Sequence, residues 1–295
     1  MEITRMPMQQ RPQMNQRRSM QTPKFKVAMR RSGKLMRGSA RTIWRLIPSS
    51  LRAALIKGFL NSITDREKFD LGAPSVLGLL QNVREAGFSP RTIVDVGANV
   101  GNWSRMTATV FPDSRYFMFD ADPDNEPQLQ RSCTLVGGKA EYAITLLGPT
   151  DSDAVTFYKT GAGSSVLPEL TTFDRTAVTL PMCTLDGFMS RRTYDSPLLL
   201  KLDVQGFELE VLRGALTLLA SAELVIMETS LLPYNEGSPL LVDVIDFMAA
   251  EGFAVFDFCG QARRESDGIL FQTDVAFVKR DSALRAPRKF WRREP

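Results

Sequence analysis

The stretch IVDVGANVGNWS, residues 93–104, decides the fold of this 295-residue chain. Its first residues form the apolar run of a buried strand, and the run ends at Gly97. Glycine at 97 and 101 lets the backbone turn tightly and approach a ligand, while the helix expected next offers unpaired N–H groups. Asn99 replaces the middle glycine of the dinucleotide fingerprint. A ligand with an amino acid carboxylate and a sulfonium therefore fits better beside Asp95 than one with phosphates.

A second strand is expected at residues 116–120, which completes one βαβ unit with the glycine turn. Asp120 closes this strand roughly twenty residues after the turn, where a carboxylate can accept hydrogen bonds from both hydroxyls of a ribose. A glycine turn alone is often only a tight connection between a strand and a helix. The turn and the acidic strand end together predict binding of a nucleoside ligand.

Helical and strand patterns alternate from about residue 72 onward, which predicts an α/β domain with a mainly parallel sheet. The first helix is expected between Pro74 and Gly87, and further helices at 207–220 and at 239–250, the latter capped by Ser238. The expected strands are residues 92–96, 116–120, 142–147, 155–158, 198–203, 224–228, 253–258 and 274–278.

The composition favours a cytoplasmic protein. The chain has three widely spaced cysteines and no C-x-x-C pair, which is typical of free thiols in a reducing compartment; they are Cys133, Cys183 and Cys259. Arg213 and Glu223 interrupt the longest apolar stretch, so it falls short of the roughly 20 apolar residues of a spanning helix. We predict no transmembrane segment and no secretory signal peptide.

Charge divides the chain into three parts. Residues 1–60 have a net charge of +13, residues 61–278 of −14 and residues 279–295 of +5. We therefore expect a basic, largely disordered tail at 1–60 with an amphipathic helix near its end, a domain at 61–280 and a basic tail at 281–295. The first tail has four interpretations: peripheral contact with an anionic membrane, a solvated arm packed on the domain, a mitochondrial-type transit peptide, or a nucleic-acid contact. The last is disfavoured because few aromatic residues accompany the charge.

Six motifs resemble the FkbM family of S-adenosylmethionine-dependent methyltransferases, over about residues 85–280. They are IVDVGANVGNWS (93–104), FDADPDN (119–125), CTLDGF (183–188), LLKLDVQGFELEVLRGA (199–215), METS (227–230) and DVAFVK (274–279). The resemblance implies a class I, Rossmann-like methyltransferase fold, with a mainly parallel seven-stranded sheet, an antiparallel last strand and helices on both faces. It also implies S-adenosylmethionine as the cofactor, held by Asp95, Gly97, Ala98, Asn99, Gly101, Asn102 and Trp103, with Asp120 at the ribose.

The chain departs from the family pattern at two places. Family members usually carry FEP where this chain has Phe119, Asp120 and Ala121, so the ribose carboxylate is one methylene shorter and a rigid proline is missing. Gln205 stands where many relatives have glutamate. Because an amide cannot act as a base, we expect Gln205 to have at most an orienting role.

Two carboxylates are the catalytic candidates, because the chain contains no histidine. Asp203 ends the fourth parallel strand, where three roles stay open: a general base for a hydroxyl, a ligand for a cation such as Mg²⁺, or a helix cap. Glu228 closes the fifth strand. We expect Lys201 to face away from Asp203 unless the strand ends early, and Glu208 to complement the helix N-terminus.

The acceptor side is expected to include Lys201, Ser164 and Tyr234. Ser164 and Ser165 follow two glycines and resemble the family's acceptor-side loop, although a surface hairpin turn explains them equally well.

The resemblance implies an O-methyltransferase that acts on a hydroxyl of a sugar in a surface glycan or of a secondary metabolite. A carboxylate can remove the hydroxyl proton in such a displacement, so the lack of histidine is no obstacle. One alternative is a nucleic-acid or protein methyltransferase, which the charge of −14 on the core disfavours. Another is a non-catalytic cofactor-binding scaffold protein recruited through its basic tail.

Overall fold

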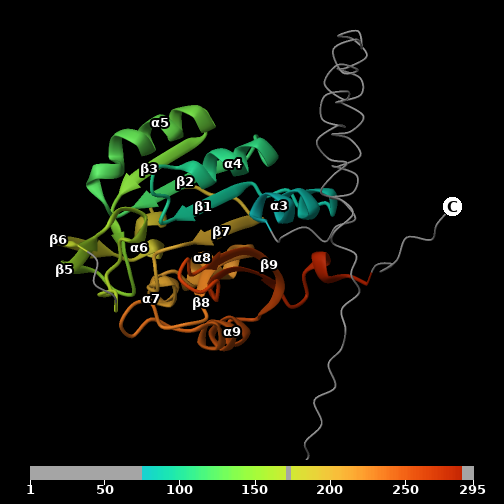
Figure 1. Ribbon diagram of the computed structural model, residues 1–295. Coiled ribbons are helices and arrows are strands. Elements are labelled where there is room, and N and C mark those ends of the chain that lie inside the picture. The colour runs from blue at the N-terminus through green and yellow to red at the C-terminus, as the bar shows by residue number, and fades with distance from the viewer. Residues whose placement is uncertain (1–74, 171–173, 288–295) are drawn as a thin grey trace, which may run out of the picture. The chain divides into compact units, whose positions relative to one another are not determined.

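A computed structural model describes residues 75–170 and 174–287 (Figure 1). The predicted N-terminal tail with its helix, and Pro74, lie outside the described residues, as do residues 288–295. In the part that is described, no helix has the length and apolar character needed to cross a bilayer.

A seven-stranded sheet in the order β3-β2-β1-β7-β8-β10-β9 forms the centre of the described region (Figure 1). Neighbouring strands are parallel from β3 to β8, whereas β10 is antiparallel to both β8 and β9. This confirms the mainly parallel sheet with an antiparallel last strand. The strands are β1 (Thr92–Val96), β2 (Arg115–Asp120), β3 (Ala140–Ile144), β7 (Leu198–Leu202), β8 (Ala222–Ser230), β9 (Phe253–Arg263) and β10 (Leu270–Lys279).

Helices cover both faces of this sheet, as predicted (Figure 1). One face carries α3 (Val76–Glu85), α4 (Asn102–Val110) and α5 (Glu126–Val136), and the other carries α6 (Leu185–Met189), α7 (Glu208–Arg213), α8 (Leu216–Ser221) and α9 (Leu241–Ala250). Three short 3₁₀ turns complete the description: η1 (Pro123–Asn125), η2 (Gly161–Gly163) and η3 (Ala283–Arg285).

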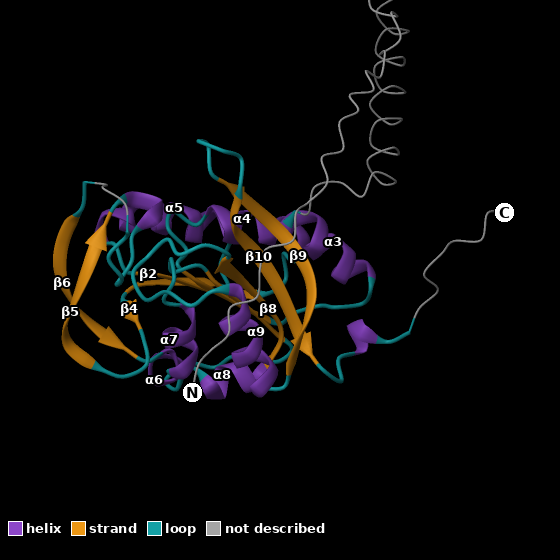
Figure 2. Ribbon diagram, turned by 60° about the horizontal axis from the view of Figure 1, so that its bottom comes forward, coloured by secondary structure: helices purple, strands orange, loops and turns teal. Residues whose placement is uncertain are grey.

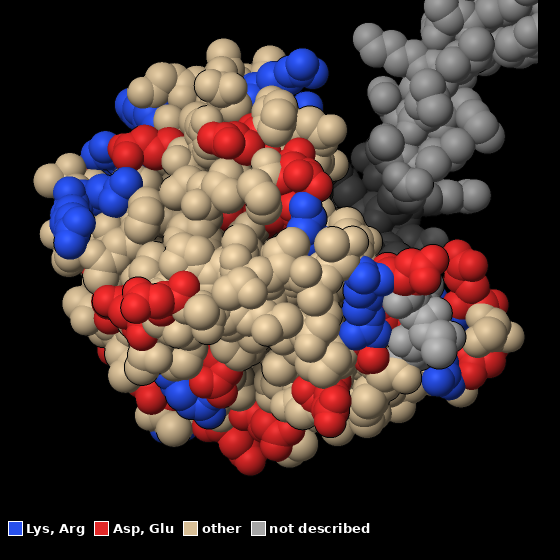
Figure 3. Space-filling model, turned by 90° about the vertical axis from the view of Figure 1, so that its left-hand side faces the viewer, with Lys and Arg blue, Asp and Glu red and all other residues tan. Residues whose placement is uncertain are grey.

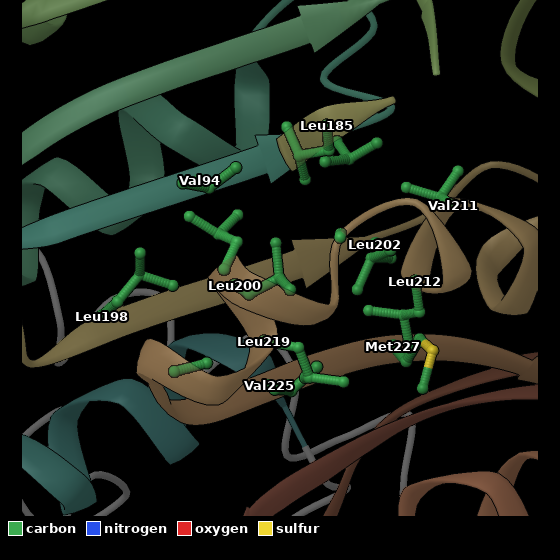
Figure 4. Close-up of a cluster of buried hydrophobic side chains, with 14 of the residues drawn as sticks. Val94, Leu185, Leu198, Leu200, Leu202, Val211, Leu212, Leu219, Val225 and Met227 are labelled. Carbon is green, nitrogen blue, oxygen red and sulfur yellow. The ribbon is translucent and has the colours of Figure 1, made fainter. Parts of the chain in front are cut away.

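The leucine-rich strand β7 shows how the core divides. Leu198, Leu200 and Leu202 pack into the cluster beneath α6 to α9 (Figure 4), while Leu199 packs into the cluster beneath α3 and α4. All four are fully buried, because a strand at the centre of a parallel sheet has helices on both faces.

A second, three-stranded sheet lies beside the first, at the end remote from β9 and β10 (Figure 2). It consists of β4 (Leu146–Leu147), β5 (Ser152–Lys159) and β6 (Thr176–Cys183), in the order β4-β6-β5. The strand predicted at 142–147 is in fact two strands, because the chain leaves the first sheet at Thr145 and enters the second. Strand β6 was not predicted, since Pro181 interrupts its pattern; this proline lies where the register between β5 and β6 shifts.

Two helix predictions were wrong in detail. The helix expected at 207–220 is broken after Arg213: the carbonyl of Gly214 accepts the N–H of Asp186, and the carboxylate of Asp186 accepts the N–H groups of Thr217 and Leu218 at the start of α8. The cap expected from Ser238 is absent. Helix α9 begins two residues later, and the carboxylate of Asp243 accepts the N–H of Leu240 at 2.8 Å.

The chain continues past the boundary predicted at residue 280. Ser282 is buried and hydrogen bonds to Glu223, and Leu284 packs against the cluster beneath α3. Ser282 and Leu284, which follow the predicted boundary, thus contact the domain.

Candidate active site

A cavity of about 360 Å³ lies at the carboxyl ends of β1, β2 and β7, where the strand order reverses. Open α/β sheets bind their ligands at such a point. The walls come from the glycine turn, the end of β2, the second sheet with its loop, and the turn after β7. They include Gly97, Ala98, Asn99, Asn102, Trp103, Asp120, Asn125, Thr145, Leu146, Phe157, Ser164, Val166, Lys201, Asp203 and Phe207.

The glycine turn is tied to strand β2. The N–H groups of Gly97 and Ala98 both donate to the carbonyl of Phe119, at 2.9 and 2.8 Å. Gly97, Asn99 and Gly101 all have positive φ angles, of 74°, 50° and 79°. The turn therefore has a fixed shape, in which alternate residues adopt the left-handed conformation.

The two glycines allow close packing within the protein, whereas close approach to a ligand was expected. A Cβ atom built on Gly97 would lie well under 3.0 Å from the carbonyl oxygen of Asp203, and one on Gly101 would lie under 3.0 Å from the side chain of Ser132. Gly101 does not line the cavity. The glycines let β7 and α5 pack against the turn, and Gly97 also borders the cavity.

Hydrogen bonds within the protein already use most of the acceptor positions of the Asp120 carboxylate. Its Oδ1 accepts hydrogen bonds from Asp122 N and Asn125 Nδ2, at 2.9 and 3.0 Å, and its Oδ2 accepts one from Asn99 N at 2.7 Å. A carboxylate has about four acceptor positions, so Oδ2 keeps one, which suits one ribose hydroxyl rather than the two expected. Burial raises the pKa of Asp120, and the three hydrogen bonds partly oppose that rise.

Asp95 and Lys201 form a buried ionic group beneath the turn. They are cross-strand neighbours on β1 and β7, and Lys201 Nζ lies 3.3 Å from Asp95 Oδ1 and 3.0 Å from the carbonyl of Gly97. Ser104 Oγ donates to Asp95 Oδ2 at 2.6 Å. Asp95 is fully buried and does not line the cavity, so it supports the turn from behind.

The expectation that Lys201 faces away from Asp203 was wrong. Lys201 Nζ lies 3.4 Å from Asp203 Oδ2. Strand β7 ends at Leu202, before Asp203, and residues two apart share a face even within a strand. Burial alone would lower the pKa of Lys201, but the charges of Asp203 and Asp95 outweigh burial and raise it. Lys201 borders the cavity as a cation already paired with two carboxylates.

Asp203 and Glu228, the two catalytic candidates, occupy different layers. Asp203 lines the cavity with 36% of its side chain exposed, whereas Glu228 is absent from the wall. Gln205 lies between them, and its Nε2 donates to Asp203 Oδ1 at 2.9 Å and to Glu228 Oε2 at 2.6 Å. Burial, with the nearby charges of Asp203 and Glu208, raises the pKa of Glu228 well above its usual range. Glu228 is therefore linked to the cavity wall through Gln205 and Asp203.

Glu208 holds the turn after β7. It is the first residue of α7, as its predicted role at a helix N-terminus requires, and its Oε1 accepts the N–H groups of Val204 and Gly206 at 2.9 and 3.1 Å. Burial raises its pKa to about 7, and these hydrogen bonds oppose the rise.

The Glu208 carboxyl is expected to make stability fall as pH rises. Its folded pKa of about 7 lies above the ordinary value of 4.5, so its contribution is fully present below pH 4.5 and is lost as pH rises through about 7. In Glu208→Gln the amide oxygen can still accept both N–H groups, but the titration is gone. Urea unfolding at a series of pH values should therefore show the wild type losing stability relative to the variant over this range. A difference that does not change with pH would contradict this. Glu210→Gln, on the same helix, controls for loss of a charge.

The predicted acceptor-side residues differ in whether they line the cavity. Ser164 borders the cavity, but its hydroxyl is also part of a hairpin turn, where it accepts from Thr160 N at 2.9 Å and donates to the carbonyl of Gly161 at 2.7 Å. The hairpin turn is therefore present, and the acceptor-side role of this loop stays a prediction. Tyr234 does not line the cavity; its ring packs against Phe271, and its hydroxyl hydrogen bonds to Glu169.

The described residues include no group of three or more His, Cys, Asp or Glu side chains arranged to hold a metal ion. Asp203 instead has Lys201 and Gln205 as its close partners.

The sequence matches the family model described as the methyltransferase FkbM domain, over residues 95–255. This match spans more than half of the chain, from the glycine turn to β9. The chain belongs to the FkbM methyltransferase family. No curated protein sequence matches it.

Solved structures similar to this FkbM-family chain are distant in sequence. Magnesium protoporphyrin IX methyltransferase from Synechocystis PCC 6803 with bound SAM is 13% identical, with a TM-score of 0.41 over 69% of this chain and 76% of that one. An O-methyltransferase family protein from Burkholderia thailandensis is 10% identical, with a TM-score of 0.41 over 70% and 55%. The 1,6-didemethyltoxoflavin-N1-methyltransferase of the same organism is 14% identical, with a TM-score of 0.37 over 79% and 90%.

Several cavity residues of this FkbM-family methyltransferase were missed in the sequence analysis. Leu146 and Phe157 belong to the second sheet and Thr145 leads into it, and the position of this sheet beside the first has no local signature in the sequence. Phe207 could have been predicted as a cavity residue, since it lies within the longest family motif, four residues after Asp203.

Proposed function

We propose that this methyltransferase uses S-adenosylmethionine to methylate a hydroxyl of an uncharged acceptor, such as a sugar of a surface glycan or a secondary metabolite. One observation carries the proposal. A single cavity has the carboxylate of Asp120, with an open acceptor position, and the carboxylate of Asp203 on its wall, with the glycine turn between their strands.

The residues present suit the parts of this cofactor. Helix α4 has no acidic residue in its first turn, and its first residues, Asn102 and Trp103, border the cavity; the positive end of a helix suits a carboxylate. Asp120 suits a ribose hydroxyl. The apolar side chains of Leu146 and Phe157 suit the adenine ring.

Asp203 is the proposed base for the acceptor hydroxyl. When bound, S-adenosylmethionine supplies an electrophilic methyl group. Of the described carboxylates that line the cavity, Asp120 is engaged by three hydrogen bonds from the turn and from η1, which leaves Asp203 to receive a proton. Gln205 and Lys201 hold its two oxygens from the protein side.

The charges on the wall favour an uncharged acceptor. Among the described residues, the charged side chains that line the cavity are Asp120, Asp203 and Lys201, and the last is already neutralised by two carboxylates. A phosphate would meet no unpaired cation on this wall. The surface on the side of β5 and β6 has a broad uncharged centre, with acidic side chains in its upper, lower and right-hand parts and basic ones at its left and to the right of the centre (Figure 3). These features support a neutral acceptor over a nucleic acid.

Replacing Asp120 with alanine is expected to weaken binding of S-adenosylmethionine by about 10- to 100-fold, since a hydrogen bond to a charged group contributes roughly 1.5–3 kcal/mol. Calorimetric titration of the wild type and the variant measures this directly, with NAD as a second titrant that the wild type should not bind. Asp153→Ala, at an exposed position on β5, is the control and should bind like the wild type.

Failure of the folded wild type to bind S-adenosylmethionine would refute the proposal and favour a scaffold protein with a degenerate pocket. Equal binding by wild type and Asp120→Ala would remove Asp120 from the site.

A further inference from the structure

The side chain of Gln205 joins two carboxylates with one amide group. Its Nε2 donates one hydrogen bond to Asp203 on the cavity wall and one to Glu228 behind it, at 2.9 and 2.6 Å. An amide nitrogen carries two hydrogens, so both bonds are made at once. An ionised glutamate at this position has no hydrogen to donate and could make neither.

The backbone of Gln205 is held in place from several directions. Its carbonyl accepts hydrogen bonds from Ser165 Oγ at 2.9 Å and Asn235 Nδ2 at 2.5 Å. Its φ angle is 56°, in the left-handed region that residues other than glycine seldom adopt. Surrounding structure must maintain such a conformation, and here it aims the amide between the two acids.

Acidic residues surround this amide. Asp203 lies on the same turn as Gln205, and Glu208 lies on α7. Glu228 on β8 and Asp274 on β10 are directly opposite each other on adjacent strands. Lys201 on β7 is the cation beside Asp203, and it is shared with Asp95 on β1. A carboxylate at 205 would be added beside these four acidic residues, of which Asp203 alone forms an ion pair with Lys201.

We propose that Gln205 is a positioning residue for Asp203: its neutral amide fixes the direction of that carboxylate at the cavity and separates it from the carboxyl group of Glu228. The inference rests on the proposed function, because it assigns Asp203 the role of base. Gln205 acts through Asp203, since its own bonds point to the two acids and it does not line the cavity.

The chain offers a matched control for the test. Gln272 Nε2 also donates to Glu228 Oε2, at 2.9 Å, but none of its hydrogen bonds reaches Asp203. Gln205→Glu and Gln272→Glu therefore make the same chemical change against the same carboxylate, and they differ in their contact with Asp203.

The experiment compares the affinities for S-adenosylmethionine and S-adenosylhomocysteine by calorimetry between about pH 5 and pH 9. The first compound has a positive sulfonium and the second does not, so the ratio of the two affinities reports on ionised carboxylates at the cavity. In Gln205→Glu, repulsion between neighbouring carboxylates should move the midpoint of this ratio upward by about one pH unit relative to the wild type. In Gln272→Glu the midpoint should stay at the wild-type value. Equal movement in both variants, or movement in neither, would overturn the inference.

A second measurement separates this inference from the proposed function. If the wild type bound neither compound, the proposed function would fail, and unfolding free energies at about pH 8 would decide whether Gln205 acts on Asp203. Asp203→Asn should then restore stability lost in Gln205→Glu but not stability lost in Gln272→Glu, as a double-mutant cycle measures. Restoration in both backgrounds, or in neither, would overturn the inference.

Discussion

Asp203→Asn is expected to lower kcat for methyl transfer by about 10²- to 10⁴-fold, the range over which a general base contributes. Asparagine keeps the size of the side chain, and its carbonyl oxygen can still accept the hydrogen bond from Gln205, but it cannot take a proton. Affinity for S-adenosylhomocysteine should stay at the wild-type value, because that compound carries no sulfonium to meet the lost charge. The measurement is transfer of labelled methyl to the acceptor that the wild type uses, together with calorimetric titration.

The control for this prediction is Glu228→Gln. Glu228 does not line the cavity, and its Oε2 accepts hydrogen bonds from Gln205 and Gln272. A glutamine there can still accept one, so its loss of kcat should be under about tenfold. A loss in Glu228→Gln as large as that in Asp203→Asn would make Glu228 the base. Full turnover by Asp203→Asn would remove the base from the mechanism.

Elements whose determining contacts are local could be predicted from the sequence. The strand, turn and helix of residues 92–110 follow one another without a break, so hydrophobic spacing and glycines were sufficient to predict them. Asp120 was found by the same logic, because it ends the next strand of the same βαβ unit. Its loss of acceptor capacity to Asn99, Asp122 and Asn125 was not foreseen, since it depends on how η1 folds back toward β2.

Contacts between distant segments account for what was missed. The sequence shows that Gln205 replaces a glutamate, but the bridge to Glu228 appears only once β8 lies beside β7. The pairing of Lys201 with Asp95 also requires β1 and β7 to be neighbours. Only the orientation of Lys201 relative to Asp203 could have been predicted correctly, because the period of a strand already places residues 201 and 203 on one face.

Gly97→Ala is expected to destabilise the fold by about 3 kcal/mol or more, which places it among the severe single substitutions. Two effects combine. At a φ angle of 74° an L-residue is strained by roughly 1–2 kcal/mol. The new Cβ atom would also lie well under 3.0 Å from the carbonyl oxygen of Asp203, so the ends of β1 and β7 would have to separate. That movement would disturb the bond from Lys201 to the carbonyl of Gly97.

Gly252→Ala isolates the first of these effects. Gly252 has a φ angle of 85°, but a Cβ atom there would meet no heavy atom within 4 Å. Its loss of stability should therefore reflect the backbone alone, at about 1–2 kcal/mol. Urea unfolding of the two variants beside the wild type gives both free energies. If Gly97→Ala costs no more than Gly252→Ala, the two strand ends can separate freely, and the close contact between Gly97 and Asp203 does not stabilise the site. A larger cost for Gly97→Ala means that this glycine is required by the packing of the protein against itself, before any ligand binds.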